Sequence, residues 1–155
     1  MEIKLITENK KQFLDLLLLA DEQEDMIDKY LDRGDLYVLY DGGPRSSCVV
    51  TREGEGIFEI QNLATYEAYQ RMGYGRRLID YVCEQYAGRG NVMYVGTGNV
   101  PAAVSFYERS GFVFSHTIEN FFADNYRHPM HEDGILLKDK VFLKREYNQN
   151  GGNPV

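Results

Sequence analysis

Residues 61–87 read QNLATYEAYQRMGYGRRLIDYVCEQYA, and they join a hydrophobic run, a glycine-containing loop and an amphipathic helix. The apolar side chains of the helix recur at the spacing of one helical face: Leu78, Ile79, Val82, Cys83 and Tyr86. Gly73 and Gly75 permit positive φ and a close approach of a ligand to the backbone. The first N–H groups of a helix lack intrahelical partners and carry partial positive charge. This order of elements therefore predicts an anion site suited to a pyrophosphate.

Three arginines, Arg71, Arg76 and Arg77, bring full positive charge to the same end of the helix. Gln70 and the two glycines of the loop form the pattern Q-x-x-G-x-G. This pattern resembles the acyl-CoA-binding signature of the GCN5-related N-acetyltransferases, the GNAT family. The arrangement of the chain termini also resembles the bacterial members described as aminoglycoside 6′-acetyltransferase-like.

A second block of sequence resembles a later motif of the same family, at the usual distance downstream. It reads Asn99-x-x-Ala102-x-x-x-Phe106-Tyr107-x-x-x-Gly111-Phe112. Two motifs in the expected order carry more weight than either alone, and together the resemblance covers residues 57–114. It implies a fold in which two central parallel strands, residues 57–65 and 91–95, splay apart to hold acetyl-CoA. The pantetheine arm would pair with the opened strand edge as an extra strand would.

The resemblance implies acetyl-CoA as the co-substrate, with no metal. The residues that we expect to contact acetyl-CoA are Leu63, Ala64, Thr65, Gln70, Arg71, Met72, Gly73, Tyr74, Gly75, Arg76, Asn99 and Tyr107. For Asn99 two compatible interpretations stand, a pantetheine contact and a helix cap, and we favour the cap.

Composition places limits on the class of protein. The 155 residues suit one domain over residues 1–147, followed by a polar tail, residues 148–155, with nothing to bury. A net charge of −7 argues against nucleic acid as a partner, and no apolar run reaches the ~20 residues of a membrane span. Cys48 and Cys83 both fall in apolar runs, which predicts buried core thiols in a cytoplasmic protein. A monomer and a homodimer are equally compatible with the sequence.

The pattern of the remaining chain predicts a mixed α/β fold, with about six or seven strands and four helices. Short turns between the early strands indicate an antiparallel meander, and the later helices act as crossovers. We expect a helix over residues 10–20, and a second that is capped by Asp21-x-x-Glu24 and ended by Gly34. The strands are expected at residues 3–6, 36–40, 47–52, 57–65, 91–95, 112–117 and 141–145.

Acetyl transfer to an amine needs a base, because alkylamines have a pKa of about 10 and are protonated at neutral pH. Glu59 is the first candidate, since it precedes Gln70 on the strand beside the motif, where histone-modifying relatives carry a glutamate. Period-two alternation puts Glu59 on the same face as Gln61 and Leu63. A solvated strand charge is an equally good interpretation of Glu59, and Glu67 and Asp124 are the alternative bases.

Tyr107 is the candidate acid, because the resemblance places this tyrosine near the thioester sulfur, where a phenol can protonate the departing thiolate. The alternative is a packing tyrosine, since the chain holds twelve of them. The oxyanion of the reaction would be held by a backbone N–H within residues 63–65.

Two other patterns are poor candidates for a functional site. Gly96-Thr97-Gly98 echoes a dinucleotide fingerprint, but Pro101 replaces its third glycine. Residues 128–133 hold two histidines and two carboxylates in a spacing that matches no zinc pattern. The neighbouring aromatic side chains instead predict a wall for binding an amine: Phe121, Phe122 and Tyr126.

The sequence thus predicts an N-acetyltransferase whose substrate is a small cationic molecule or peptide. The primary amine of that substrate would attack acetyl-CoA directly. A non-catalytic acyl-CoA-binding or regulatory module on the same fold is the alternative from another class. A nucleotide-binding Rossmann-type domain is the third, more distant hypothesis.

Overall fold

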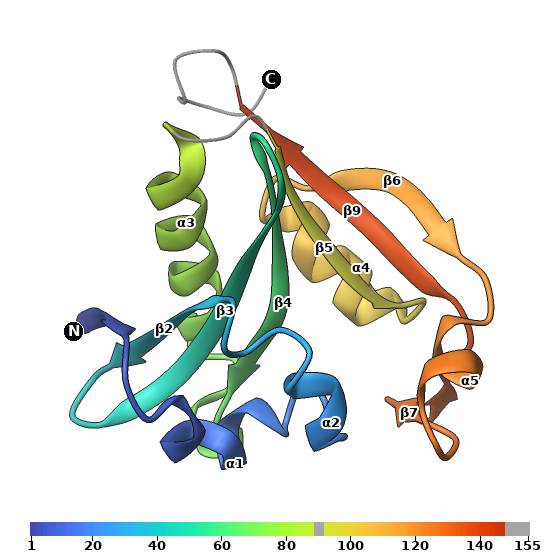
Figure 1. The fold of residues 1–155 in the computed structure, drawn as a ribbon, viewed down its shortest axis with the longest axis horizontal. Helices are drawn as coiled ribbons and strands as arrows, with labels where there is room; N and C mark the ends of the chain where they lie inside the picture. The colour runs from blue at the N-terminus through green and yellow to red at the C-terminus, as the bar shows by residue number, and fades with distance from the viewer. Residues whose placement is uncertain (89–91, 148–155) are drawn as a thin grey trace.

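The computed structural model describes residues 1–88 and 92–147. Its centre is a seven-stranded mixed sheet with the order β1-β2-β3-β4-β5-β9-β6, and a two-stranded β7-β8 hairpin stands apart from it (Figure 1). The strands are β1 (Glu2–Ile6), β2 (Asp35–Tyr40), β3 (Pro44–Gly54), β4 (Ile57–Thr65), β5 (Val92–Gly98), β6 (Val113–Ile118), β7 (His131–Glu132), β8 (Ile135–Leu136) and β9 (Lys140–Glu146).

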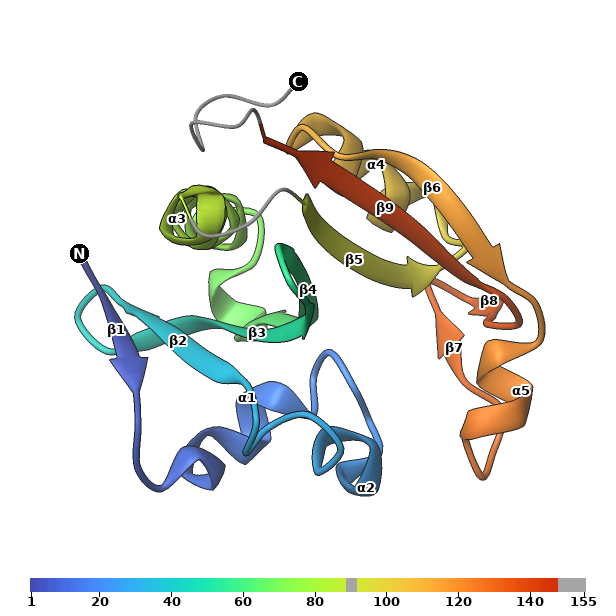
Figure 2. The same ribbon diagram turned by 45° about the horizontal axis from the view of Figure 1, so that its top comes forward.

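Five α-helices and two 3₁₀ helices complete the described part of the chain. They are η1 (Lys10–Phe13), α1 (Leu14–Leu17), α2 (Glu24–Ile27), η2 (Glu67–Tyr69), α3 (Tyr74–Ala87), α4 (Pro101–Arg109) and α5 (Phe121–Asn125). Helix α3 covers one face of the β2–β4 part of the sheet, and α1 and α2 lie against the other (Figure 2). No described helix has the length and apolar character required to span a lipid bilayer.

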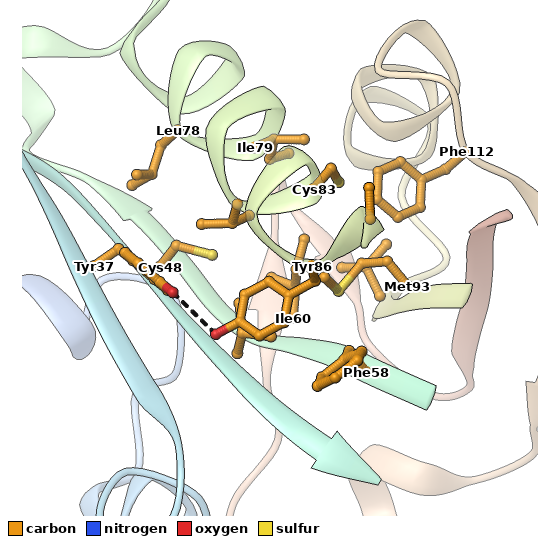
Figure 3. Close-up of a cluster of buried hydrophobic side chains, with 14 of the residues drawn as sticks. Tyr37, Cys48, Phe58, Ile60, Leu78, Ile79, Cys83, Tyr86, Met93 and Phe112 are labelled. Atoms are coloured by element: carbon orange, nitrogen blue, oxygen red, sulfur yellow. Dashed lines mark hydrogen bonds between the residues drawn. The ribbon is translucent and has the colours of Figure 1, made fainter. Parts of the chain in front are cut away.

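The core under α3 joins both motif regions of the sequence. Leu78, Ile79, Val82 and Cys83 are fully buried on the inner face of α3, as their spacing predicts. They pack against Cys48 of β3, and both cysteines are free and buried (Figure 3). The hydroxyls of Tyr37 and Tyr86 lie 3.1 Å apart within this cluster (Figure 3). Burial of such side chains stabilises a fold by about 1.5–3 kcal/mol each, so this cluster fixes α3 on the sheet.

The two central parallel strands pair only over their first halves. β4 and β5 are in register from Ile57↔Val92 to Ile60↔Val95, and no pairing between them continues beyond that point. Residues 61–65 stay with β3 and residues 96–98 stay with β9, so the two halves of the sheet diverge (Figure 1). The predicted splay of these strands is confirmed, although Asn91, the expected first residue of the second strand, lies outside the described residues.

A β-bulge sits where β4 and β5 part. On the β3 side, Ile60 pairs with Val50 and Asn62 pairs with Val49, which leaves Gln61 as an extra residue in β4. A bulge bends its strand and reverses which face the following side chains take. The bulge therefore supplies a physical reason for the divergence of the two strands.

Several local predictions are wrong in detail. The expected helix over residues 10–20 is a 3₁₀ turn followed by a single α-helical turn. Gln23, and not Asp21, is the N-cap residue of α2, which ends well before Gly34. Asn99 is not a cap either, because Val100 holds that position. The asparagine and aspartate side chains were expected to bind the helix N–H groups, and neither helix shows such a bond.

Residues 118–134 have more regular structure than their polar composition predicts. They form α5 and the first strand of the β7-β8 hairpin, so the described chain has five α-helices where four were expected. Pro101 begins α4 and Gly111 follows its end with φ of 92°, both as predicted. The predicted tail at 148–155 lies outside the described residues.

Candidate active site

The glycine loop leaves open space at the N-terminus of α3. Gly73 is the N-cap residue with φ of 88°, and a Cβ at this position would have no neighbour within 4 Å. Arg71, also at positive φ, and Met72 are exposed beside it. Arg76 is exposed and forms a salt bridge of 3.3 Å with Asp80 one turn later. An open turn with free helix N–H groups and exposed guanidinium groups fits a phosphate-bearing ligand.

The same loop is tied to the divergent end of β4. The side-chain amide of Gln70 donates a hydrogen bond of 3.0 Å to the carbonyl oxygen of Thr65. A Cβ at Gly75 would lie 3.6 Å from Oγ1 of Thr65 and 3.7 Å from the ring of Phe106 on α4. The loop, the end of β4 and α4 thus meet at one place, because Gly75 has no side chain to separate them.

A cavity of about 590 Å³ opens where β4 and β5 part. Its lining comes from the divergent strand ends, from the segment between α1 and β2, from α4, and from the segment between α5 and β9. Glu59, Leu63, Phe106 and Tyr107 all line it, so the cavity continues from the contact between the glycine loop and α4. A ligand that starts at the loop and follows β4 would reach this cavity.

Glu59 faces the cavity from the paired half of β4. Its neighbours Phe58 and Ile60 point into the core under α3, so Glu59 points to the other face, towards α1 and α2. Leu63 packs against the α3 core, which places it on the face opposite to Glu59. The prediction that Glu59 and Leu63 share a face is wrong, because the bulge at Gln61 shifts the alternation by one residue.

Burial raises the pKa of Glu59 above its ordinary value, while the positive charge of Lys140 opposes that shift. Lys140 begins β9 and lines the same cavity, and burial lowers the pKa of its ammonium group. Its Nζ lies 4.5 Å from the centre of the Phe121 ring and 5.0 Å from that of Phe142. A carboxylate with a raised pKa is better suited to take a proton near neutral pH than an ordinary glutamate.

Tyr107 reaches the cavity from α4. Its ring packs edge-on against Phe106 and Phe112, with centroid distances of 5.2 and 5.9 Å. Burial raises the pKa of the phenol, with smaller contributions from Cys48 and Glu132, so the hydroxyl keeps its proton at neutral pH. Among the described residues this hydroxyl has no hydrogen-bond partner, which leaves its proton available to a ligand.

Four residues of the cavity lining are joined by a chain of hydrogen bonds. Asp21 accepts hydrogen bonds from Tyr126 at 2.7 Å and from Tyr30 at 3.0 Å. The hydroxyl of Tyr30 in turn accepts a bond of 3.1 Å from the amide of Asn62 on β4. We call Asp21, Tyr30, Asn62 and Tyr126 the clasp. It joins the α5 segment to the α1–α2 segment, which face one another in Figure 2.

The sequence patterns did not identify Lys140 or the clasp. Asp21 was interpreted as a helix cap, and its true partners lie 9 and 105 residues away in the chain. Gly96 was noted in the sequence only because Gly96-Thr97-Gly98 echoes a dinucleotide fingerprint, and the structure gives this glycine a different role. A Cβ at Gly96 would overlap the side chain of Lys140 and lie 3.0 Å from Phe142, so this glycine makes room for both.

Only some of the remaining candidates line the cavity. Phe121, Phe122 and Tyr126 line it, as the predicted aromatic wall requires, whereas Asp124 and Glu67 are exposed and do not. Ala64 is buried, Tyr74 is buried with its hydroxyl 2.6 Å from Asp41, and Asn99 is exposed. Within residues 1–88 and 92–147, no group of three His, Cys, Asp or Glu side chains is arranged to hold a metal.

A splayed pair of parallel strands, an open glycine loop and a tyrosine-lined cavity define the class of acyl-CoA-dependent acyltransferases. The family model described as "Acetyltransferase (GNAT) domain" matches residues 32–114. The chain belongs to the GNAT family of acetyltransferases. A curated relative, the uncharacterized N-acetyltransferase YvbK of Bacillus subtilis, is 32% identical over 146 residues, covering 92% of this chain and 94% of the relative.

Two solved structures are similar over nearly the whole chain. A GNAT family acetyltransferase from Elizabethkingia anophelis with acetyl-CoA bound has a TM-score of 0.89 and 32% identity, covering 94% of this chain and 97% of that one. A Bacillus subtilis acetyltransferase in complex with CoA has a TM-score of 0.87 and 31% identity, covering 95% and 99%. An aminoglycoside 6′-N-acetyltransferase is only 17% identical, with a TM-score of 0.69, so it shares the fold alone.

Proposed function

We propose that this protein transfers the acetyl group of acetyl-CoA to a primary amine of a small acceptor that is cationic at neutral pH. One observation carries the proposal: a single cavity at the divergence of β4 and β5 holds both Glu59 and Tyr107. A proton acceptor and a proton donor in one cavity are the two groups that amine acetylation requires. The relatives that hold acetyl-CoA and CoA support the choice of co-substrate.

The pyrophosphate of acetyl-CoA would bind at residues 70–76. There Gly73 leaves the backbone open, and the helix N-terminus and Arg71 supply positive charge. The pantetheine amides would pair with the free edge of residues 61–65, which β5 leaves unpaired. Asn99 would contact the same arm. The acetyl thioester would then enter the cavity beside Tyr107.

Acetyl-CoA supplies an activated thioester carbon. In the proposed reaction Glu59 takes a proton from the ammonium group, and the neutral amine attacks the carbonyl carbon directly. A backbone N–H within residues 63–65 donates to the developing oxyanion. The C–N bond forms, the nitrogen releases its second proton to solvent, the C–S bond breaks, and Tyr107 gives its proton to the thiolate. Solvent then restores the proton to Tyr107 and removes that of Glu59.

Titration with acetyl-CoA by calorimetry, combined with a free-thiol assay over a panel of amines, tests this function. We expect saturable acetyl-CoA binding and thiol release that depends on both the amine and the enzyme. Binding of acetyl-CoA without transfer to any amine would instead identify an acyl-CoA-binding module. Absence of both would contradict the proposal entirely.

A further inference from the structure

Two opposite charges face the acceptor cavity without pairing. Glu59 and Lys140 both line it and influence one another's pKa, yet neither side chain forms a hydrogen bond or salt bridge with another described residue. Leaving a half-buried carboxylate and ammonium group unpaired is costly, because protein surroundings replace the water that stabilised them. Such an arrangement suits a ligand that presents an anion to one group and a cation to the other.

The position of Lys140 is fixed by its surroundings. Its side chain runs over Gly96, where any larger residue would overlap it, and its Nζ lies over the rings of Phe121 and Phe142. Aromatic faces stabilise a cation without using its N–H donors. Lys140 therefore keeps its donors for a ligand, and a charge-assisted hydrogen bond from such a group is strong.

Two of the other charged side chains of the lining are already engaged. Asp21 accepts from two tyrosines in the clasp, and Arg33 forms a salt bridge of 2.8 Å with Glu53. The lining as a whole contains as many basic as acidic side chains, namely Lys29, Arg33, Lys140, Asp21, Glu59 and Glu132. A purely cationic acceptor such as a polyamine would be repelled by Lys140, so the cavity favours a zwitterion.

We propose that the acceptor is a small amino acid-like zwitterion, whose carboxylate binds Lys140 while its primary amine faces Glu59. This inference rests on the proposed function: it keeps the protonated primary amine and the acetyl transfer, but it replaces a net cationic acceptor with one that also carries a carboxylate. The aromatic side chains of the cavity, including Phe122 and Tyr126, would contact the remainder of the acceptor. Lys140 is then a specificity-determining residue, and the carboxylate is the feature that it selects.

Matched pairs of amines test the role of the carboxylate. The measurement is kcat/KM for each amino acid of a panel and for the decarboxylated amine with the same side chain. For the wild type we expect the best amino acid to exceed its decarboxylated partner by about 10- to 100-fold, the range of one hydrogen bond to a charged group. In Lys140→Gln this ratio should fall close to one. Lys140→Arg should keep part of it, because the charge remains.

Lys144→Gln is the matched control. It removes the same charge from the same strand, where Lys144 pairs with Glu146 at 2.6 Å outside the cavity lining. The control should keep the wild-type ratio. If the wild type acetylates decarboxylated amines as well as their amino acids, the zwitterion proposal is overturned while the proposed function stands. The same holds if Lys140→Gln retains the full ratio.

A binding measurement separates this inference from catalysis. Calorimetry would compare an N-acetylated amino acid with its methyl ester as ligands of the CoA-saturated protein. We expect the free carboxylate to bind at least about 10-fold more tightly in the wild type, and equally with the ester in Lys140→Gln. Equal binding of acid and ester by the wild type would overturn the inference, whether or not any amine is acetylated.

Discussion

The hydroxyl of Tyr126 lies 2.7 Å from Oδ1 of Asp21, a residue 105 positions earlier in the chain. Arg127 reinforces this connection, since its backbone N–H donates to Gln23 at 3.2 Å and its guanidinium group pairs with Asp25. The α5 segment is thereby joined to the α1–α2 segment across the cavity that we assign to the acceptor. We therefore expect acceptor binding to depend on this connection, which no local sequence pattern encodes.

Tyr126→Phe should weaken acceptor binding. The substitution removes the hydrogen bond to Asp21 and leaves Asp21 with one donor in place of two. We therefore expect KM for the acceptor to rise several-fold and the free energy of unfolding to fall by about 1 kcal/mol. Affinity for acetyl-CoA should not change, because Tyr126 follows α5 and is not part of the glycine loop to which we assign the pyrophosphate. Steady-state kinetics and denaturant unfolding would measure both effects.

Tyr66→Phe serves as the control for this variant. Its hydroxyl also binds an aspartate, Asp15, at 3.1 Å, but Tyr66 is not part of the cavity lining. An equal rise in KM in both variants would show that the clasp has no specific role at the acceptor site.

Gly73→Asp should abolish acetyl-CoA binding, because it adds a side chain and a negative charge where the pyrophosphate is expected. Gly134→Asp imposes similar backbone strain, since Gly134 has φ of 74° and is equally open, but it lies in the β7-β8 turn. Calorimetry should find wild-type affinity in that control. A folded Gly73→Asp variant with unchanged affinity would exclude the loop as the pyrophosphate site.

Tyr107→Phe should lower kcat by about 10²- to 10⁴-fold, the usual contribution of a positioned proton donor, and leave KM for acetyl-CoA similar. The control is Tyr81→Phe, which removes a hydroxyl from α3 outside the cavity. The comparison is made by steady-state kinetics. Near-normal turnover of Tyr107→Phe would leave Tyr107 with a packing role only.

Glu59→Gln should change the pH dependence of the reaction. Without the carboxylate, the pH profile of kcat/KM should lose its acid limb. The value of kcat/KM should fall strongly near pH 7 and recover in part at pH 9 to 10, where more of the amine is already neutral. A wild-type pH profile in Glu59→Gln would indicate that no single carboxylate acts as the base.

The same substitution makes a prediction for stability. Because burial raises the pKa of Glu59 above its ordinary value, the folded protein holds this proton more tightly than the unfolded chain does. The contribution of Glu59 to stability is therefore complete when the pH is below the ordinary pKa of a glutamate. It is lost as the pH rises through the pKa that Glu59 has in the folded protein. Glu59→Gln should be more stable relative to wild type at pH 7 than at pH 4. Denaturant unfolding at both pH values would reveal the opposite trend if Glu59 were paired in the folded protein.

The sequence allowed prediction of those features that depend on neighbours in the chain. The stripe of Leu78, Ile79 and Val82, the turn at Gly73 and the end of α4 at Gly111 are each set by local periodicity and backbone freedom. The antiparallel meander of the early strands and the crossovers through helices followed from the lengths of the links, whereas the place of β9 between β5 and β6 was not predicted. Glu59 was proposed from its place before the glycine-loop motif and Tyr107 from its place within the second motif, and both line the cavity.

Features that depend on distant partners were not predictable in this way. The extra residue at Gln61 is visible only once β3 is paired with β4, so the faces of Glu59 and Leu63 were misassigned. Lys140 enters the cavity because Gly96, on the neighbouring strand, leaves space for it. Asp21 has the sequence context of a helix cap, and tertiary contacts with two tyrosines determine its actual role.

Mass spectrometry of a reaction of purified protein, acetyl-CoA and a panel of amines that includes amino acids is the decisive test of acetyl transfer by this protein. We expect at least one acceptor to gain a single acetyl group on its nitrogen, with one free CoA formed per product. We also expect Tyr107→Phe to form this product far more slowly. A protein that binds acetyl-CoA but acetylates no amine of the panel, or that works equally well without the Tyr107 hydroxyl, would contradict these expectations.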